Sequence, residues 1–595
     1  MSAILFRRYL AKYRSNVNID ALKEHLLRSL KTQENLVCLR QLADAASKLA
    51  EVIAASGDKN TPNPEWSEFY QLLSEWTGSE FPKLREIALY ILTNLIRSNS
   101  LGENILPQIS NIFLIRLVDQ SPQVKIAALQ GIAMMLITGY LAPQAVNDHM
   151  GEILNLIKYL VKEVEEEAIR AIGYLIEMGE SCPELFRVPC DQFLELFYSI
   201  VSEDDFEEAT RNEALEFIVT LIEQKPGMFR KRPEFMQAFI KLLLQRMMEI
   251  DDDPEWNRKD RSDGDDGTRN PASESLDRLS IAIRGQTVVP ILFGYIQELI
   301  KDAHWTKRYV AIMAISISAE GCLNTLLNHM DDVVRLLVPA FEDQHQRVRW
   351  AACNAVGQIA NDFSQHNFQQ IYGPQLLPLI MHVMNDFKNP RVQSHACAAI
   401  VNFCEPSPAE VVTPFLADLM RHLALIFQNN PREIVLEQAI TAVSAIADCV
   451  REAMTPWYKD LVNYLKSILV LPVNKEFAPI KGRAIEALSM LAIAVGKPVF
   501  MEDAEEVLKI LLNIQGNLMP GYDPQASFLK TAWARLCKVL KEDFVPYLNY
   551  VLPELFEIIK QDVNIIVLDV DDTTFNNDEN WQSIPVSDRK IWFNT

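Results

Sequence analysis

The sequence predicts an all-α fold made of stacked helical hairpins, and three observations lead to this prediction. First, a short turn, often with Asp or Pro, precedes an apolar, alanine-rich stretch about every 40 to 47 residues. Second, 49% of the residues are hydrophobic and only 20 are glycine, which suits a helix-rich chain with a continuous core. Third, 595 residues are too many for one compact core, whereas a solenoid adds core one layer at a time. The expected architecture is a HEAT-repeat superhelical solenoid of about eleven helical hairpins.

The repeat is clearest where the chain reads Val348-Arg349-Trp350-Ala351-Ala352. Small residues at these positions let the second helix of each hairpin approach its neighbours closely, as parallel layers require. In chain order, this second helix is expected around residues 43–50, 84–91, 124–131, 167–173, 211–217, 308–314, 348–355, 392–399, 436–442, 483–487 and 531–534.

Two acidic segments interrupt the repeat and divide the chain. The predicted parts are N-terminal repeats in 1–250, an acidic flexible loop in 251–285, central repeats in 286–560, and an acidic irregular tail in 561–595. The loop is rich in aspartate and poor in apolar residues, which is typical of a solvated linker. The alternative is a second contact for a basic partner, through Asp251, Asp252, Asp253, Asp265 and Asp266.

Several kinds of chemistry are not indicated. The nine cysteines are scattered singly without a C-x-x-C pair, which favours reduced core thiols over disulfides or a metal site. The sequence has no phosphate-binding loop, no nucleophile elbow and no zinc-protease motif, so no cofactor is expected. Apolar runs such as 131–142 stop short of a membrane span, and the N-terminus lacks a signal-peptide layout. We therefore expect a soluble intracellular protein without membrane contact.

One motif in the tail needs a separate interpretation. Residues 565–573 resemble the strand and D-x-D-x-T opening of haloacid dehalogenase phosphatases, in which Asp569 would be the nucleophile and Asp571 the general acid. That site also needs a lysine and further carboxylates from a whole α/β domain, and an acidic loop between repeats explains the residues more simply. The protein is therefore not expected to be an enzyme.

Charge narrows the class of partner. The formal net charge is −22, so the basic footprint of a nucleic-acid-binding protein is missing and a polycationic partner is favoured. The bland alternative is that an acidic surface only keeps a large protein soluble.

A polar stripe along the second helices indicates where a basic partner would bind. Residues spaced four, four and three apart share one face of a helix, and in the second helices this face is polar while the alanine-rich face must be buried. The stripe is expected to line the inner, concave wall, where amides, carboxylates and tryptophans would suit an extended basic peptide. For any one carboxylate, a solvated helix face is an equally good interpretation. The candidate peptide-binding residues are Glu320, Trp350, Asn354, Gln358, Asp362, Asn402, Glu405, Glu437, Asp448, Glu486 and Trp533.

The same stretches carry a family resemblance that extends over essentially the whole chain. The stretches that carry it include 304–322, 348–358, 391–396, 435–438, 494–497 and 532–537. In these stretches the sequence resembles the importin-5 group of karyopherin-β receptors.

The resemblance implies a nuclear import receptor that shuttles between cytoplasm and nucleus. Such receptors bind lysine-rich nuclear localisation signals of basic cargo on the concave surface, contact FG-repeat nucleoporins, and release cargo when Ran-GTP binds. It places Ran on the N-terminal repeats and cargo on the stripe from about Glu320 to Glu486. Chains of that family are nearly twice as long and begin about one repeat earlier, so this sequence resembles a piece truncated at both ends. The alternative is a HEAT-repeat scaffold or regulatory subunit for a folded protein partner.

Overall fold

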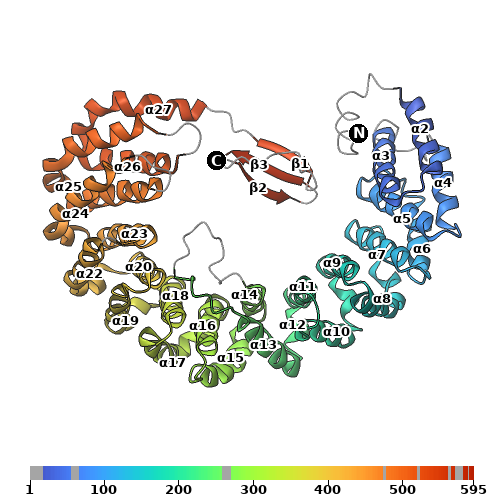
Figure 1. Cartoon of the computed structure of the whole chain (residues 1–595), viewed down its shortest axis with the longest axis horizontal. Helices are drawn as coiled ribbons and strands as arrows, with labels where there is room; N and C mark the ends of the chain where they lie inside the picture. Colours follow the sequence, from blue (N-terminus) through green and yellow to red (C-terminus); the bar gives the residue numbers. More distant parts are fainter. Residues whose placement is uncertain are drawn as a thin grey trace. The chain divides into compact units, whose positions relative to one another are not determined.

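The structure is a computed structural model, and it describes residues 18–54, 66–257, 270–429, 431–472, 477–518, 523–560, 565–569, 581–586 and 589–594. The chain divides into two compact units between Leu242 and Leu243, inside helix α13 (Pro233–Met247). Each unit is a stack of helical hairpins (Figure 1), which confirms the predicted all-α HEAT-repeat solenoid.

In the N-terminal unit, the first helices of the hairpins form an outer row. These are α2 (Ile19–Thr32), α4 (Ser67–Thr77), α6 (Leu106–Arg116), α8 (Met150–Glu163) and α10 (Cys190–Ser202), followed by the short α12 (Pro226–Phe229). The second helices form an inner row in which each packs on the next. They are α3 (Leu36–Ala54), α5 (Pro82–Arg97), α7 (Pro122–Ile137), α9 (Glu165–Ser181) and α11 (Glu208–Gln224). All five repeat copies predicted in this part of the sequence lie in these inner helices.

The C-terminal unit repeats the arrangement. Its outer helices are α15 (Gly285–Leu299), α17 (Met330–Leu337), α19 (Phe368–Met384), α22 (Leu416–Gln428), α24 (Thr455–Leu469) and the second half of α25 (Ala478–Gln515), with the short α21 (Ala409–Val412). Its inner helices are α14 (Pro271–Ile283), α16 (Trp305–Leu326), α18 (Gln346–Asp362), α20 (Pro390–Cys404), α23 (Glu433–Val450), the first half of α25, and α26 (Pro524–Leu540). The outer helix α27 (Leu548–Lys560) follows. The remaining six predicted copies all lie in inner helices.

Local sequence explains where many inner helices begin. Proline occupies the first turn of α5, α7, α14, α20 and α26, where its fixed φ suits a helix and its missing N–H costs nothing. Two of these helices also have a side-chain cap: Asn270 accepts a hydrogen bond from the Ala272 N–H, and Asp523 accepts one from the Gln525 N–H.

Close packing of the inner row depends on small residues. At Gly321 in α16, a Cβ atom would lie 2.4 Å from the carbonyl carbon of Ser280 and 2.5 Å from the backbone nitrogen of Ile281 in α14. No side chain fits there, because the two backbones are in direct contact. The alanines of α18 are equally enclosed, with Ala351, Ala352 and Ala355 all fully buried.

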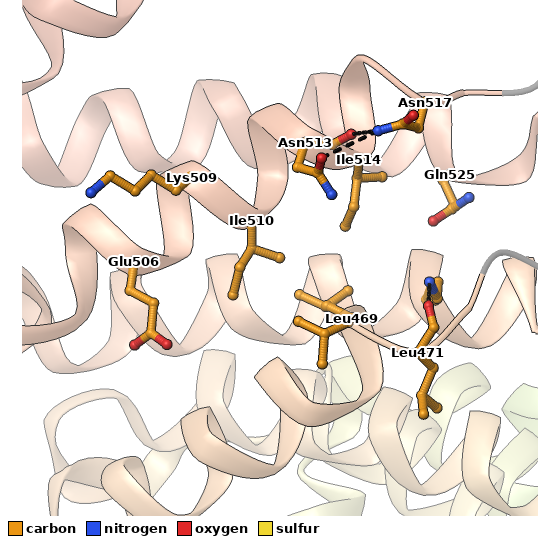
Figure 2. A pocket seen from close by; sticks show the side chains of 11 residues that line it. Leu469, Leu471, Glu506, Lys509, Ile510, Asn513, Ile514, Asn517 and Gln525 are labelled. Carbon is orange, nitrogen blue, oxygen red and sulfur yellow. Dashed lines mark hydrogen bonds between the residues drawn. The ribbon is translucent and has the colours of Figure 1, made fainter.

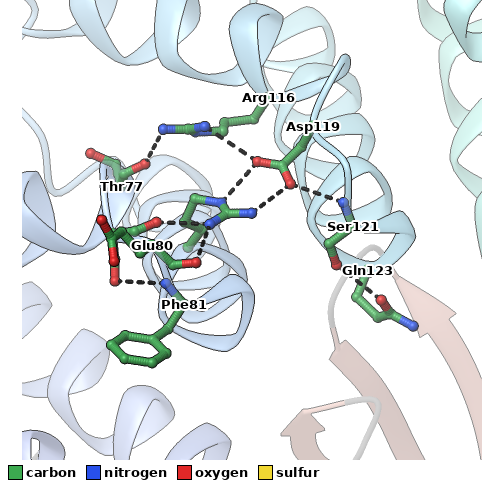
Figure 3. A network of polar contacts seen from close by, with 9 residues as sticks. Thr77, Glu80, Phe81, Arg116, Asp119, Ser121 and Gln123 are labelled. Atoms are coloured by element: carbon green, nitrogen blue, oxygen red, sulfur yellow. Dashed lines mark hydrogen bonds and ion pairs between the residues drawn. The ribbon is translucent and has the colours of Figure 1, made fainter.

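An arginine–aspartate ladder joins successive layers. In each copy, an arginine near the start of an inner helix donates to two backbone carbonyls five and six residues earlier, and also to an aspartate in the next turn region. Figure 3 shows the environment of one of these aspartates, Asp119, which also accepts from Arg116 and from the Ser121 N–H. The three pairs are Arg85–Asp119, Arg308–Asp343 and Arg349–Asp386.

The predicted acidic loop is shorter than expected. Helix α14 occupies residues 271–283, which the sequence analysis assigned to the loop 251–285. The prediction was wrong there because Leu276, Leu279 and Ile283 form a buried apolar face at helical spacing, and acidic neighbours masked this pattern. With α14, the described residues contain one more inner helix than the eleven repeat copies predicted.

The tail is not wholly irregular. It contains three strands, β1 (Ile565–Asp569), β2 (Trp581–Val586) and β3 (Arg589–Asn594), in an antiparallel sheet of order β1-β3-β2. In the register, Val567 and Ile584 both pair with Ile591. Asp569 ends a strand, as the phosphatase motif requires, but Asp571 lies outside the described residues, and the strand pairs antiparallel instead of entering a parallel α/β sheet.

Two helical stretches meet the length and hydropathy of a membrane span, contrary to the sequence expectation. They are Trp305–Glu342, with 67% of its apolar window buried, and Ala478–Gln515, with 61% buried. The second stretch is broken at Gly496, whose φ of 73° and ψ of 172° are not helical. Packing within hairpins accounts for the apolar character of both stretches. The nine cysteines are all free thiols, but the prediction of core positions was wrong for Cys38 and Cys537, which are exposed. Burial raises the pKa of Cys397 to about 12.

Candidate functional site

The polar stripe of α18 and α20 lies on their most accessible side. Gln358, Asn402 and Glu405 are exposed, whereas the neighbouring alanine and aliphatic residues are buried. This follows from helical geometry, since the opposite face of each helix packs into the hairpin core. The stripe of the C-terminal unit's inner row thus presents amide and carboxylate groups side by side.

Three carboxylates from successive inner helices interact at this surface. Asp277 of α14 and Asp362 of α18 are half-buried, and Glu320 of α16 is exposed. Burial raises the pKa of Asp362 to about 6, and the charges of Glu320 and Asp277 add to this shift. A hydrogen bond from Gln358 acts in the opposite direction. Burial and the charge of Glu320 also raise the pKa of Asp277. We call Asp277, Glu320 and Asp362 the acidic cluster. A cation placed among these like charges would offset their mutual repulsion and part of the cost of burying the carboxylates.

Asp362 is only partly satisfied by its neighbours. Its Oδ1 accepts a hydrogen bond of 2.9 Å from Gln358 Nε2, while its buried Oδ2 has no hydrogen-bond partner. A buried acceptor without a donor is costly, so the ionised carboxylate of Asp362 is incompletely satisfied in this structure.

The structure corrects the prediction for Trp350, which is buried, with 4% of its side chain exposed. Its ring stacks on His395, with 4.2 Å between ring centroids, and meets the edge of Trp256 at 6.3 Å. Asn354, one turn later in α18, accepts through Oδ1 from His395 Nε2–H at 3.1 Å and donates through Nδ2 to Ser316 Oγ at 3.2 Å. Both residues therefore serve internal contacts between layers in this structure.

The predicted carboxylates in α23 and α25 are paired with arginine side chains. Glu437 is buried, with 5% exposed, and lies 3.6 Å from Arg483. Glu486 pairs with Arg483 at 2.9 Å and lies 3.9 Å from Arg535. Asp448 is exposed and pairs with Arg451 at 2.6 Å. The prediction of open carboxylates was thus wrong for Glu437, because an arginine of the next repeat covers it, and Glu486 is already paired.

Trp533 is a core residue and not a surface contact. Its side chain is 4% exposed, its Nε1–H donates to Gln515 Oε1 at 2.8 Å, and its ring lies against Phe544. The prediction failed because the stripe spacing does not reveal that α25 and the turn before α27 cover this end of α26.

The predicted acidic loop is described only in part. Asp251 and Asp252 are exposed and Asp253 is half-buried, while Asp265 and Asp266 lie outside the described residues. Asp252 lies 3.8 Å from His345, but burial lowers the pKa of His345, so the imidazole is neutral at pH 7 and this contact contributes little.

A separate groove lies between α24 and the second half of α25, among outer helices (Figure 2). Its volume is about 540 Å³, and Leu469, Ile510 and Ile514 form its apolar wall. At its rim, Val470 is 67% exposed and Leu471 is 43% exposed. The repeat pattern did not predict this groove, because it forms between the outer helices of two successive hairpins. Exposed aliphatic residues beside a concave apolar wall are typical of binding surfaces.

The inner row of the N-terminal unit has a smaller, charged depression. It has a volume of about 230 Å³ and is lined by residues of α3, α5, α7 and α9. Arg40 pairs with Glu86, and Arg170 pairs with Glu167 at 2.7 Å. Among the residues that the structure describes, no group of three or more His, Cys, Asp or Glu side chains is arranged to hold a metal ion.

Comparison with known proteins gives matches along the whole chain. Residues 34–196 match the family profile "IPO5-like, TPR repeats", residues 203–290 match "Importin repeat", and residues 305–359 match "HEAT-like repeat". "Importin subunit beta-3" of Saccharomyces cerevisiae is 30% identical over 620 aligned residues, which cover 100% of this chain and 56% of the relative. The "Probable importin-5 homolog" of Dictyostelium discoideum is 25% identical, with 89% of this chain and 50% of the relative covered.

Solved structures agree with these relatives. Kap121p bound to Pho4p superposes with a TM-score of 0.84 at 27% identity, covering 100% of this chain and 57% of that one. Kap121p bound to Nup53p gives a TM-score of 0.83 with the same identity and coverage. The chain thus spans about half the length of the relatives it matches. Repeat architecture, sequence likeness and structural likeness agree from end to end, and the chain is an importin-5-like member of the karyopherin-β family, which consists of transport receptors and not of enzymes.

Proposed function

We propose that this chain is part of a nuclear import receptor that shuttles between cytoplasm and nucleus. In this proposal, the inner row of the C-terminal unit binds lysine-rich nuclear localisation signals, outer surfaces contact FG-repeat nucleoporins, and Ran-GTP binding releases the cargo. The single observation that carries the cargo proposal is the acidic cluster of Asp277, Glu320 and Asp362, which continues through exposed Asn402 and Glu405.

The cluster suits lysine side chains for physical reasons. An ammonium group donates three hydrogen bonds, so it can pair with the exposed Glu320 and lie near the half-buried Asp362. Amides such as Asn402 can bond the peptide backbone, which lets an extended chain run across successive helices. The net charge of −22 adds long-range attraction that speeds encounter and weakens with salt.

Fluorescence anisotropy of a labelled lysine-rich peptide tests the cargo proposal across a salt series. The test variant combines Glu320→Gln, Asp362→Asn and Glu405→Gln. If each partly exposed lysine–carboxylate contact contributes about 0.5 to 1 kcal/mol, the variant should bind roughly 10- to 150-fold more weakly.

A matched control removes the same total charge from outer helices. It combines Asp332→Asn, Asp418→Asn and Glu505→Gln, whose side chains are 55%, 56% and 76% exposed. We expect this control to bind within about twofold of the wild type at physiological salt, because exposed charges farther than a Debye length are screened. Equal losses in both variants would mean that overall charge, and not the inner face, binds the peptide. No binding by any of the proteins would favour a scaffold for a folded partner.

For FG-repeat nucleoporins, we propose the groove between α24 and α25. Its apolar wall and exposed rim could accept a phenylalanine ring, and one similar structure contains Kap121p with Nup53p. Val470→Asp should weaken binding of a Phe-Gly repeat peptide without unfolding, since Val470 is 67% exposed. Binding that is unchanged in this variant would exclude the groove as the contact.

For Ran, we propose the inner row of the N-terminal unit, which the family resemblance suggests and the charged depression at Arg40 and Arg170 supports. The measurement is release of the bound lysine-rich peptide by Ran carrying a non-hydrolysable GTP analogue, with Ran-GDP as the control. Release by neither form would contradict Ran-dependent unloading by this chain.

A further inference from the structure

The segment 251–257 follows α13 and lies against the inner row of the C-terminal unit. Its acidic side chains Asp251, Asp252 and Glu255 are exposed, but Trp256 is 5% exposed. A tryptophan buried in a non-helical acidic segment is unusual, because such segments carry too little apolar surface to order themselves. The contacts of Trp256 show what holds it.

Two guanidinium groups and a second tryptophan surround the Trp256 ring. The Cζ atoms of Arg347 and Arg391 lie 5.2 and 4.7 Å from the ring centroid, and the ring of Trp350 meets it edge-on at 82°. Cations at this distance from an indole face are attracted by its quadrupole, more strongly when the contact is desolvated. We call Arg347, Trp350 and Arg391 the socket.

Hydrogen bonds fix the backbone and the next residue. Arg391 donates through one terminal N–H to the Trp256 carbonyl oxygen at 3.0 Å. Asn257 donates through Nδ2 to Asn389 Oδ1 at 2.7 Å and also to Gln346 Oε1. These partners lie at the starts of α18 and α20, so the segment bridges two adjacent inner helices.

The socket has the opposite charge to the rest of the stripe. Arg347 and Arg391 are cationic; burial lowers the pKa of Arg347, and the charges of Asp252, Asp253 and Asp251 are among those that oppose this shift. The starts of α18 and α20 therefore match an acidic segment with one tryptophan, whereas the acidic cluster matches lysines. Trp350 and Asp362 both lie in α18, twelve residues apart, or about 18 Å along the helix axis.

We propose that the segment 251–257 is an intramolecular occupant of the cargo-binding surface, which covers Trp350 and is displaced when a lysine-rich peptide binds. This inference rests on the proposed function. An extended peptide of about seven residues reaches from the acidic cluster to Trp350, whose ring can take the stem and ammonium of a lysine once Trp256 leaves. Displaced carboxylates of the segment can then pair with other lysines of the peptide. The peptide binds only molecules in which this surface is open. The apparent association constant is therefore the intrinsic constant multiplied by the open fraction.

Trp256→Ala tests the proposal, because it removes the anchor and keeps every carboxylate. Peptide anisotropy should show about three- to tenfold tighter binding by this variant than by the wild type. Hydrogen exchange of residues 251–257 in the wild type should become faster when the peptide is bound. Asn257→Ala removes the hydrogen bonds to Gln346 and Asn389 and leaves the aromatic contacts, so it should shift affinity in the same direction by less. This second variant guards against a folding defect in the first. Trp256→Phe should bind nearly as the wild type does.

The outcomes separate this inference from the proposed function. Equal or weaker binding by Trp256→Ala, together with lost binding by the Glu320, Asp362 and Glu405 variant, would overturn the displaced segment and leave the cargo proposal standing. Binding by Trp256→Ala but not by the wild type would support a segment that blocks the surface fully. No binding by either protein would overturn both proposals.

Discussion

Removal of Arg308 should loosen the layer formed by α16 and α18. Arg308 donates to Asp343 at 2.7 and 2.8 Å, and its remaining terminal nitrogen donates to the carbonyl oxygens of Asp302 and Ala303 at 2.9 Å each. The Arg308 side chain is 18% exposed and that of Asp343 is 12% exposed, so water replaces these contacts poorly. Arg308→Ala therefore leaves one carboxylate and two carbonyls with fewer donors.

The cost can be bounded from these contacts. Burial opposes ionisation of Asp343, but hydrogen bonds from Arg308 and the His345 N–H, together with the charge of Arg308, hold the pKa of Asp343 below its usual value. Breaking a fully buried ion pair costs about 3 to 5 kcal/mol, and the residual exposure of both partners reduces this to about 2 to 3 kcal/mol. A depressed carboxylate pKa also means that this stabilisation is present at neutral pH and is lost as pH falls through the folded-state value.

Hydrogen exchange measured by mass spectrometry is the suitable assay, because repeats contact only their neighbours and open locally. A loss of 2 to 3 kcal/mol corresponds to about 30- to 150-fold faster exchange in amides of α16 and α18. The control is Arg335→Ala, whose partner Asp332 lies in the same helix and whose side chain is 75% exposed. This control should change exchange by about twofold or less. If both variants change exchange equally, the ladder does not stabilise the layers as argued.

Three other predictions concern single residues of the C-terminal unit. Binding of a lysine-rich peptide, measured by anisotropy, should weaken up to about tenfold as pH falls through about 6, because protonation of Asp362 removes a charge that attracts the ammonium group. Asp362→Asn should abolish this pH dependence, and an unchanged pH dependence in that variant would contradict the assignment. Trp533→Ala should destabilise α25 and α26 by about 3 to 5 kcal/mol in hydrogen exchange, with peptide affinity unchanged, since Trp533 is a core residue; a selective loss of affinity would restore it as a contact. Gly496→Ala should cost about 1 to 3 kcal/mol in denaturant unfolding, because a φ of 73° with a ψ of 172° strains any side chain, and no loss would mean that the kink relaxes.

Much of the fold was predictable because its signal is local. The alanine-rich stretches at helical spacing located the second helices, since close packing of layers demands small residues wherever two backbones meet, as at Gly321. The one missed inner helix, α14, lies where acidic residues interrupt the apolar pattern over a short distance. The tail strands were missed because each strand depends on partner strands elsewhere in the tail, and the helical repeat does not predict these pairs.

The candidate site divides in the same way. Spacing along α18 and α20 was enough to place Gln358, Asn402 and Glu405 on the open side of their helices. Spacing could not show which long side chains of neighbouring repeats reach over a stripe. Arg483 extends from α25 to Glu437, and this contact depends on how two layers are rotated against each other.

The sequence by itself therefore determined the class of fold, the order of the inner helices and the acidic character of the surface, because periodicity and charge are properties of each segment. Only the tertiary structure decided which stripe residues are accessible. Trp350 is covered by Trp256 from a distant part of the sequence, and the ladder of arginines and aspartates joins residues 34 or more positions apart. Such contacts form only when the layers stack, so no single helix carries their signal.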